Sequence, residues 1–554
     1  MIKNAKEEYQ MWLDNVHDAE VRKELLAIQH NDEEILDRFY KFIDFGTAGL
    51  RGKMGAGTNY MNIYIVRRTS LAIAKYMNDN KLKSIAISYD SRNNSRQFAI
   101  EASKILAKNG ITTYLFKEIM PTPTLSYAVR HLKCDMGIMI TASHNPSIYN
   151  GYKVYGNDGC QVTSQTADDI KNYVDKEGLF GIRGMNFEEA IQEGKIRWIR
   201  HEVVDKFMEH VSHVRTNRRS LKRLTVVYTP LNGAGWKLVP KALENAGVCD
   251  LYSVPNQDYP DGNFPTCPKP NPEVREALEE GIKVCKEYDA DILIATDPDC
   301  DRVGTAVKHN GEYVLISGNE MGCLLLNYIL EQRKLDDNLP ANPLVVKTIV
   351  TSELTRQIAK KYGVELKNVL TGFKYIGSII TDLEKVNKRN DFLFGFEESY
   401  GYLAGTFVRD KEAVSTSLLI AEMTEYYKNL NKSLIDVLND LYKEFGCYKH
   451  RMLDFYFEGA EGDKQMKELL NHFRTYNFRE IIGYKVMNKL DYLNGINDLP
   501  VADVLEFNLE GGNQLIIRPS GTEPKVKVYL TAVGNEKEAE RLLDRFANWF
   551  NAKL

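Results

Sequence analysis

The chain has 554 residues, of which 43% are hydrophobic and 27% charged, and its length predicts roughly three to five domains. Its 72 basic and 76 acidic side chains leave a formal charge of −4, which argues against nucleic acid as a partner. No apolar run approaches the ~20 residues of a membrane span, so we expect no membrane partner. The eight cysteines form no CxxC pairs, which indicates free thiols, and we therefore expect a cytoplasmic protein.

The first part of the chain predicts helices followed by alternating strands and helices. Apolar residues at helical spacing over residues 1–40 predict a helical lead-in packed on the first domain. The pattern then predicts strands at 84–90, 112–116 and 136–140, with helices at 98–108 and 124–132. Repeated βα units imply an open α/β domain with ligand groups at the carboxyl ends of its strands.

The same alternation starts again twice further along the chain. It predicts strands at 224–228, 291–295 and 344–350, with helices at 236–246 and 352–362. The last ~105 residues differ, because 504–509 and 514–517 alternate like antiparallel strands before a final helix at 537–551, which indicates an α+β domain. We predict four domains, at residues 1–203, 204–320, 321–446 and 447–554.

A candidate nucleophile follows the strand predicted at 136–140. The chain there reads Thr141-Ala142-Ser143-His144-Asn145-Pro146. A hydroxyl beside a histidine, at a turn closed by proline, suits an exposed nucleophile. Neighbouring serine and histidine are frequent by chance, so the loop gains weight only from the charged loops described next.

A candidate metal loop follows the strand predicted at 291–295. It reads Asp297-Pro298-Asp299-Cys300-Asp301-Arg302. In an extended loop, alternate side chains share a face, so three carboxylates can converge on a hard cation such as Mg²⁺. A solvated acidic turn is the plain alternative, whereas an EF-hand is excluded because its glycine and closing glutamate are missing.

Three further loops carry groups that suit a sugar phosphate. An arginine, two hydroxyls and a lysine that could grip phosphate occur in the segment 518–525. A carboxylate and a hydroxyl that could bind sugar hydroxyls occur in 395–402, and an arginine lies in the glycine-rich segment 45–52. Each loop alone reads as an ordinary turn, but together with the serine and the aspartates they describe one reaction.

With these motifs, the chain resembles the α-D-phosphohexomutase superfamily and, within it, the phosphoglucomutase branch. The resemblance covers nearly the whole chain, and Thr-Ala-Ser-His-Asn-Pro together with Asp-Pro-Asp-Cys-Asp-Arg is highly discriminating. The opening Phe-Gly-Thr-Ala-Gly-Leu-Arg-Gly is similar to the subgroup of bacterial phosphoglucomutases and phosphopentomutase-type enzymes. The resemblance implies three similar α/β domains with mixed sheets and a C-terminal α+β domain, like the TATA-box-binding protein, around a central cleft.

The resemblance also implies a role for each candidate residue. Ser143 would be carried as phosphoserine and, with Asp297, Asp299 and Asp301, would bind one Mg²⁺ per chain. Arg51, His144 and Arg302 would lie beside the transferring group, with Lys153 as the general base. The residues expected to meet the sugar are Thr371, Glu397, Ser399 and Lys411. Those expected to grip its other phosphate are Arg518, Ser520, Gly521 and Thr522.

The reaction implied is the interconversion of glucose 1-phosphate and glucose 6-phosphate through glucose 1,6-bisphosphate, which would also serve as activator. Tyr400-Gly401 follows the sugar-binding Glu-x-Ser where phosphomannomutase-type members tend to have Gly-His, which favours glucose over mannose. Pentose phosphates stay open as substrates. We expect small-molecule sugar phosphates as partners, and a monomer or weak homo-oligomer.

Five alternatives remain open on the sequence. The same serine would serve a phosphopentomutase, a phosphomannomutase or a sugar-bisphosphate synthase. A phosphohydrolase acting through the aspartates is disfavoured, because Asp301 stands where an Asp-x-Asp-x-Thr signature would require threonine. A non-catalytic sugar-phosphate sensor is disfavoured because all four charged loops, namely the metal loop and the three further loops, are intact.

Overall fold

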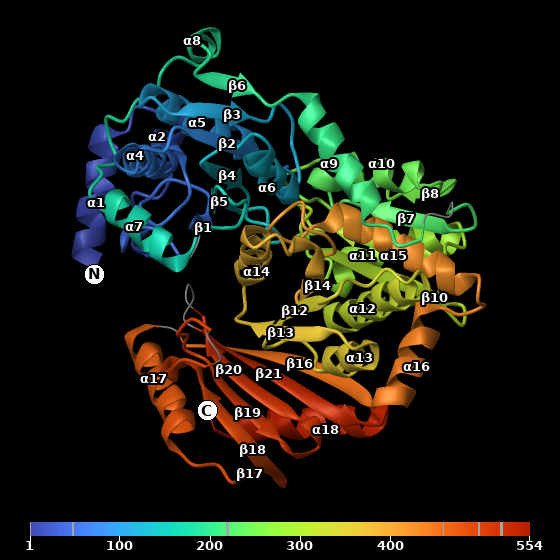
Figure 1. The fold of residues 1–554 in the computed structure, drawn as a ribbon. Helices are drawn as coiled ribbons and strands as arrows, with labels where there is room; N and C mark the ends of the chain where they lie inside the picture. Colours follow the sequence, from blue (N-terminus) through green and yellow to red (C-terminus); the bar gives the residue numbers. More distant parts are fainter. Residues whose placement is uncertain are drawn as a thin grey trace. The chain divides into compact units, whose positions relative to one another are not determined.

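The computed structural model describes residues 2–46, 49–217, 221–457, 459–496, 499–520 and 525–553. By its internal contacts the chain divides into two parts, which we describe separately (Figure 1). The first part comprises Met1–Ile316, Gly377–Arg389 and Gly401–Glu425, and the second comprises Ser317–Ile376, Asn390–Tyr400 and Tyr426–Leu554.

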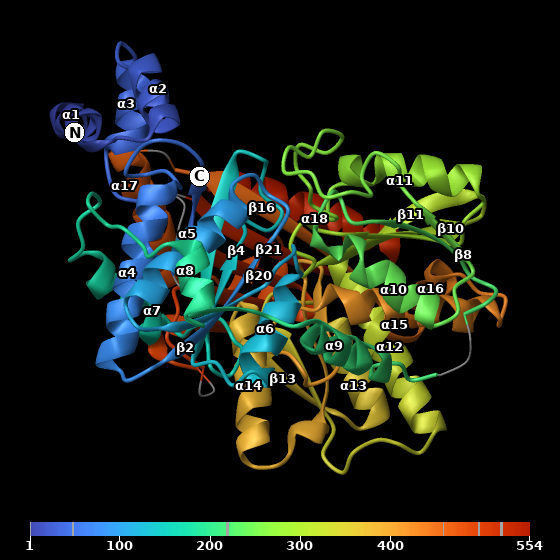
Figure 2. The same ribbon diagram turned by 90° about the horizontal axis from the view of Figure 1, so that it is seen from above.

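Three helices open the first part, as the sequence predicts. They are α1 (Ile2–Asn15), α2 (Ala19–Ala27) and α3 (Asp32–Phe39). The side chains of Asp18 and Asn31 accept hydrogen bonds from backbone N–H groups at the starts of α2 and α3, which fixes where these helices begin. Trp12 is fully buried and meets Tyr64 and Phe180 edge-on, so the helices pack on the first α/β domain (Figure 2).

The first α/β domain contains a mixed six-stranded sheet in the order β1-β5-β4-β2-β3-β6. Its strands are β1 (Gly49–Lys53), β2 (Ser84–Tyr89), β3 (Thr112–Leu115), β4 (Met136–Ile140), β5 (Tyr149–Gly156) and β6 (Ile196–Trp198). Its helices are α4 (Ile63–Asp79), α5 (Ser95–Lys108), α6 (Thr122–His131), α7 (Ser164–Val174), α8 (Phe187–Gln192) and α9 (His201–His213). β2 and β4 run parallel, so residues 90 and 141 emerge side by side at their carboxyl ends.

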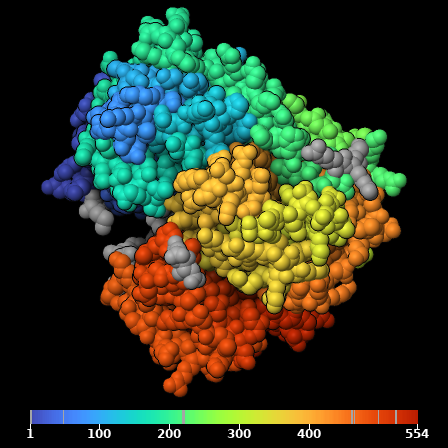
Figure 3. Space-filling model, in the orientation of Figure 1, coloured from blue at the N-terminus to red at the C-terminus, as the bar shows by residue number. Residues whose placement is uncertain are grey.

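The second α/β domain follows in the same part, with the sheet order β11-β10-β9-β7-β8. Its strands are β7 (Thr225–Thr229), β8 (Asp250–Ser253), β9 (Ile292–Thr296), β10 (Val303–His309) and β11 (Glu312–Ile316). The short helix η1 (Ala234–Trp236), α10 (Leu238–Asn245) and α11 (Arg275–Glu287) accompany them. β7 and β9 are parallel, whereas β9 and β10 are antiparallel and are joined directly by residues 297–302. The first and second domains form one continuous surface in the view of Figure 3.

The second part begins with the third α/β domain. Strands β13 (Glu365–Val369), β12 (Leu344–Thr348) and β14 (Phe392–Glu397) lie side by side in that order and run parallel. The helices here are α12 (Gly318–Leu335), α13 (Leu354–Tyr362) and α16 (Leu434–Phe445), with the short η2 (Arg389–Asp391) before β14. Strand β15 (Gly401–Leu403) belongs to the first part. Two helices are divided between the parts, namely α14 (Phe373–Lys385) and α15 (Ala413–Lys428).

The C-terminal domain is an antiparallel sheet in the order β16-β21-β20-β19-β18-β17. Its strands are β16 (Cys447–Tyr456), β17 (Glu480–Ile481), β18 (Tyr484–Asp491), β19 (Leu505–Leu509), β20 (Gln514–Pro519) and β21 (Lys525–Gly534). Its helices are α17 (Gly459–Thr475), α18 (Glu536–Asn551) and the short η3 (Tyr492–Asn494) and η4 (Glu510–Gly512). Ile349 and Leu370 of the third domain share an apolar cluster with Ile516 and Tyr529 of this sheet, so the two domains pack together.

The predicted strands and helices occur with ends shifted by three residues or fewer, as β9 (Ile292–Thr296) illustrates for the strand predicted at 291–295. The three α/β domains and the α+β domain are therefore confirmed as fold classes. All eight cysteines lie in the described ranges and are free, seven of them buried. Among the described helices, none combines the length and apolar character that crossing a bilayer requires.

A buried histidine in the C-terminal sheet predicts sensitivity to acid. His450 Nδ1 lies 3.1 Å from Thr531 Oγ1, and Nε2 is buried without a hydrogen-bond partner among the described residues. Burial lowers the pKa of His450 from 6.5 to about 4. The unfolded chain therefore binds a proton that the folded chain excludes, and stability is lost as the pH falls below 6.5 toward 4.

Replacing His450 with glutamine should remove this loss. Between pH 7 and pH 4.5, the free energy of unfolding of the wild type should fall by about 2 kcal/mol more than that of the variant. Urea titrations at the two pH values measure the difference, with the exposed His30→Gln as the matched control. An equal fall in wild type and His450→Gln would contradict the prediction.

Candidate active site

The loop after β4 holds Ser143 in a constrained, buried position. Ser143 adopts the left-handed conformation, with φ 51°, and only 3% of it is exposed. Its backbone N–H donates to Thr141 Oγ1 at 2.8 Å, and that hydroxyl in turn donates to the Asp90 carboxylate. The turn is therefore anchored to the end of β2, which is the parallel neighbour of β4.

The Ser143 hydroxyl lies between a carboxylate and a histidine. Its Oγ donates to Asp297 Oδ2 at 2.7 Å and lies 3.2 Å from His144 Nδ1. Burial and the positive charges of Arg302 and Arg51 hold the pKa of His144 well below its usual value. The imidazole is therefore neutral at neutral pH and can hydrogen-bond to the serine without adding charge.

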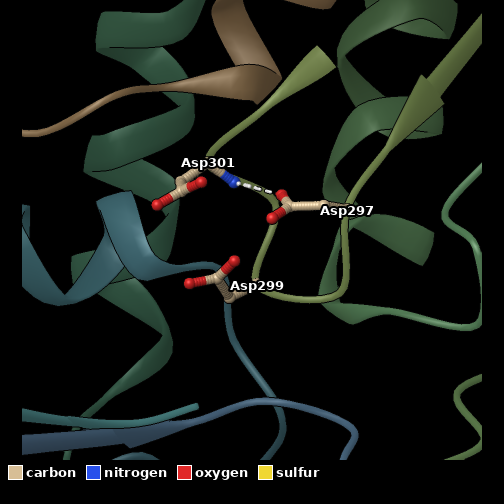
Figure 4. A group of neighbouring side chains, drawn as sticks. All are labelled: Asp297, Asp299 and Asp301. Atoms are coloured by element: carbon tan, nitrogen blue, oxygen red, sulfur yellow. Dashed lines mark hydrogen bonds between the residues drawn. The ribbon is translucent and has the colours of Figure 1, made fainter. Parts of the chain in front are cut away.

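The three aspartates converge through a tight turn, and the extended loop that we predicted is wrong. Cys300 is left-handed, with φ 52°, and its N–H donates to Asp297 O at 2.8 Å. Asp297 Oδ1 accepts from the backbone N–H groups of Asp301 and Arg302 at 3.1 and 3.0 Å. This turn folds the chain back between β9 and β10 and directs all three carboxylates to one space (Figure 4).

The aspartate cluster has the properties of a site for a hard divalent cation. One oxygen from each carboxylate lies within 4.8 Å of the others, and all three residues are at most 1% exposed. Asp299 Oδ1 and Asp301 Oδ1 are buried without a hydrogen-bond partner among the described residues. Burial and the charge of neighbouring Asp299 raise the pKa of Asp297 and of Asp301. An oxygen-only, mutually repelling set of this kind fits a metal of the Mg²⁺ type.

Two lysines already balance part of this charge. Lys153 Nζ lies 2.7 Å from Asp299 Oδ2 and 3.7 Å from Asp301 Oδ2, and Lys411 Nζ lies 3.2 Å from Asp301 Oδ2. Although burial acts to raise the pKa of Asp299, the charge and hydrogen bond of Lys153 hold it below its usual value. The first part thus brings the aspartates and both predicted lysines into one cluster.

The two predicted arginines of the first part lie at the rim of this cluster. Arg51 Nη1 donates to Asn145 Oδ1 in the serine loop at 3.2 Å. Arg302 Nη1 donates to Glu273 Oε1 at 2.6 Å, and its Nε lies 3.9 Å from Asp301 Oδ1. The segment before Arg51 includes Thr47 and Ala48, which lie outside the described residues.

The loop carrying Lys411 is held from several sides. Asp410 Oδ1 accepts from Lys411 Nζ at 3.0 Å, and Oδ2 accepts from Tyr155 Oη at 2.8 Å. A Cβ atom at Gly401 would lie 2.1 Å from Lys411 Cδ, so any side chain there would displace the lysine. Gly401, one of the two residues on which the predicted preference for glucose rests, therefore has a packing reason as well.

Sequence reasoning missed three residues that shape this site. Thr122, at the start of α6, donates through Oγ1 to Asp299 Oδ2 at 2.9 Å, and its N–H donates to Asp299 O at 2.8 Å. Asp90 and Arg92 follow β2 and contact the serine loop. Polar residues at the carboxyl end of the strand next to β4 were the available signal for these two, whereas Thr122 had none.

The predicted sugar-binding residues other than Lys411 lie in the second part. Glu397, at the end of β14, is 6% exposed and accepts from Gly372 N through Oε1 at 2.8 Å. Thr371 Oγ1, next to that glycine, is buried without a hydrogen-bond partner among the described residues. Ser399 is half-buried two residues beyond Glu397. Thr371 and Glu397 are therefore neighbours in space.

The predicted phosphate loop starts at the end of β20. Arg518 pairs with Lys527 across β20 and β21, and Ser520 N donates to Lys525 O at 2.8 Å, closing the loop. Gly521 and Thr522 lie outside the described residues. Burial and the charge of Glu398 raise the pKa of Tyr529, while Arg518 opposes this rise. Within the second part, Glu398, which follows β14, and Arg518 of the phosphate loop therefore both act electrostatically on Tyr529.

Four models of one protein family match successive segments of the chain. The phosphoglucomutase/phosphomannomutase alpha/beta/alpha domains I, II and III match residues 43–179, 205–311 and 317–445. The C-terminal domain of the same family matches residues 481–548. The order of the matches is the order of the domains described above.

Individual proteins show the same similarity. A phosphoglucomutase of Staphylococcus haemolyticus (strain JCSC1435) is 37% identical over 500 residues, covering 88% of this chain and 90% of that protein. A phosphoglucomutase of Staphylococcus aureus (strain MSSA476) is 34% identical over 539 residues, covering 94% and 95%.

Two solved structures share the fold, each with a TM-score of 0.69. A putative phosphomannomutase from Thermus thermophilus is 21% identical and covers 90% of this chain and 98% of its own. The open form of parafusin (phosphoglucomutase) from Paramecium is 17% identical and covers 91% and 94%.

Proposed function

This chain belongs to the phosphoglucomutase/phosphomannomutase family, and from that premise we propose that it interconverts α-D-glucose 1-phosphate and glucose 6-phosphate through a phosphoserine at residue 143. Family membership makes the protein a phosphosugar mutase, that is, an isomerase-class phosphotransferase. The proposal adds the substrate, the nucleophile and the other site residues.

One observation carries the choice of nucleophile. Ser143 Oγ lies 2.7 Å from Asp297 Oδ2, at the edge of a buried triad of carboxylates. A phosphoryl group on that oxygen would lie beside the aspartates and within reach of Lys153 and Arg51. A hydroxyl placed there for structure alone would need neither the triad nor the surrounding cations.

The rate of phosphoryl transfer depends more on the alignment of the reacting groups and on charge stabilisation than on covalent chemistry by the protein. In the first transfer, the bond between the phosphorus and Ser143 Oγ breaks as a bond to the free sugar hydroxyl forms. The hydroxyl proton passes to Lys153, which can accept it only as the neutral amine, after losing its own proton. The resulting bisphosphate reorients and returns its other phosphoryl group to Ser143. Mg²⁺ held by Asp297, Asp299, Asp301 and the phosphoserine would neutralise charge on the phosphoryl oxygens.

The second part would bind the rest of the substrate. Glu397, Ser399 and Thr371 offer a carboxylate and two hydroxyls for sugar hydroxyls, and Arg518 with Ser520 offers donors for the phosphate that does not react. Because either phosphate of the bisphosphate must fit this loop, it should recognise phosphate rather than the sugar carbon that bears it. Glucose 1,6-bisphosphate is accordingly proposed as both intermediate and activator.

Glucose is proposed as the preferred sugar because two bacterial relatives that match most of the chain carry the name phosphoglucomutase. The test is a panel of glucose, mannose and ribose 1-phosphates, assayed with Mg²⁺ and a trace of the matching bisphosphate. We expect the highest kcat/KM for glucose 1-phosphate. A higher value for ribose or mannose would reassign the substrate, and phosphate release without isomerisation would reject a mutase.

Replacing Arg518 with alanine should weaken substrate capture more than turnover. A bidentate contact to phosphate that is kept throughout the reaction stabilises ground and transition states alike, so its loss raises KM. We expect KM for glucose 1-phosphate to rise about 30-fold with kcat within about threefold of wild type. Arg541→Ala, a change in α18 of the same domain, is the control, and an unchanged KM for Arg518→Ala would assign the loop to structure.

A further inference from the structure

Four backbone carbonyls of the serine loop converge on one buried guanidinium. Arg92 donates through Nη2 to the carbonyl oxygens of Ser143 and Asn145. Its Nη1 donates to the carbonyl oxygens of Pro146 and Tyr149 at 2.9 and 3.1 Å. The Arg92 side chain is fully buried, so these contacts replace its hydration.

The guanidinium is itself held between the first and second domains. Arg92 Nε lies 3.4 Å from Asp90 Oδ2, and the guanidinium carbon lies 5.1 Å from the ring centre of Phe264. Beside it, Asn93 Nδ2 donates to Asn263 Oδ1 at 2.9 Å, and a Cβ atom at Gly262 would lie 2.3 Å from Asn93 N. The loop after β8 therefore covers Arg92 and restricts the movement of its guanidinium group.

The arrangement has a direct consequence for the serine. Carbonyl dipoles that point at one centre repel one another unless a cation lies there, so the course of residues 143–149 depends on Arg92. Ser143, in turn, needs its left-handed conformation to direct Oγ at Asp297. A planar fork with several fixed donors can satisfy four carbonyls at once, which a lysine ammonium cannot match.

We propose that Arg92 is a positioning residue for phosphoryl transfer, which gathers the carbonyls of residues 143–149 and thereby fixes Ser143 Oγ at the aspartate triad. Within the described residues of the first part, the guanidinium of Arg92 donates to backbone carbonyls and lies beside Asp90, and no hydrogen bond joins it to Ser143 Oγ. The proposal rests on the proposed function, because it assigns the preorganisation of that same nucleophile. Its loss should lower the rate of transfer and leave substrate binding, which belongs largely to the second part, nearly unchanged.

The test compares Arg92→Met and Arg92→Lys with Arg68→Met. Arg68 is a matched control, since it is a buried arginine of the same domain that donates to Glu177 O at 2.9 Å and lies over Phe42. Each variant is assayed for kcat and KM with glucose 1-phosphate, for melting temperature, and for hydrogen exchange of the amides in residues 143–149. The exchange measurement requires no mutase activity.

We expect kcat of Arg92→Met to fall about 100-fold with KM within about threefold of wild type, because a displaced nucleophile loses alignment. Arg92→Lys should recover part of kcat, and Arg68→Met should keep kcat within about twofold at a comparable loss of melting temperature. Exchange in residues 143–149 should accelerate in Arg92→Met and not in Arg68→Met. If Arg92→Met does not fold, Arg92→Lys carries the comparison, with an intermediate loss of kcat expected.

Two results would overturn the proposal. One is a kcat loss in the Arg92 variants no larger than that of Arg68→Met, and the other is unchanged exchange over residues 143–149. A wild-type protein without mutase activity on any phosphosugar would instead reject the proposed function. In that case the exchange data would still decide whether Arg92 orders the serine loop.

Discussion

Replacing Ser143 with alanine is expected to lower mutase turnover by at least about 10⁴-fold, because the group that carries the phosphoryl between the two sugar positions is gone. The substitution removes one buried oxygen that donates to Asp297 Oδ2, so the fold should persist. Substrate affinity should change little, since the predicted sugar and phosphate contacts remain. The measurement is kcat for glucose 1-phosphate with Mg²⁺ and glucose 1,6-bisphosphate, together with KM or the Kd of the bisphosphate.

Ser103→Ala provides the control for this experiment. Ser103 is buried in α5, and its Oγ donates a local hydrogen bond to Ile100 O at 2.7 Å, so its loss should leave turnover within about twofold of wild type. Ordinary turnover in Ser143→Ala would refute the phosphoserine scheme. A large loss in both variants would indicate a folding defect, which the melting temperatures would reveal.

Replacing Asp299 with alanine should remove metal binding and lower turnover by at least about 10³-fold. Asp299 is fully buried, contributes to the triad, and contacts both Thr122 and Lys153. Two carboxylates remain, which leaves the divalent ion short of ligands and the phosphoryl oxygens without their main source of positive charge. Titration calorimetry with Mg²⁺ or Mn²⁺, beside turnover, measures the two effects separately.

A second readout of the same variant uses stability. A ligand that binds the folded state raises its melting temperature, so wild type should melt at a higher temperature when Mg²⁺ is added, and Asp299→Ala should not. Asp291→Asn is the control, because Asp291 precedes the same strand β9 and accepts from Thr225 N instead of facing the triad. Metal binding of wild-type strength in Asp299→Ala would contradict the assignment of the metal site.

The sequence allowed the α/β and α+β domains to be predicted because their signals are local. Strands such as Met136–Ile140 and Ile292–Thr296 are short apolar runs that end in polar residues, and that pattern needs no knowledge of distant contacts. Antiparallel strands such as β5 and β10 were not predicted. Gly151 and Gly304 fall inside β5 and β10 and weaken the strand pattern there.

In the candidate site, too, features that depend on neighbouring residues could be predicted, whereas features that depend on distant contacts could not. The aspartates were predicted from their alternation, yet they converge through the left-handed turn at Cys300, which residue spacing does not encode. Thr122 and Arg92 were missed because their roles depend on contacts with Asp299 and with the carbonyls of residues 143–149. That the predicted residues of the second part bind the same substrate as the serine and the aspartates stays a prediction.

The measurement that tests the central claim most directly is the intact mass of the protein after incubation with glucose 1,6-bisphosphate and Mg²⁺, with peptide mapping of any modification. We predict a gain of one phosphoryl group, located on Ser143 and discharged when glucose 1-phosphate or glucose 6-phosphate is added. A fully active protein that never carries phosphate on Ser143, or that carries it on another residue, would contradict the claim.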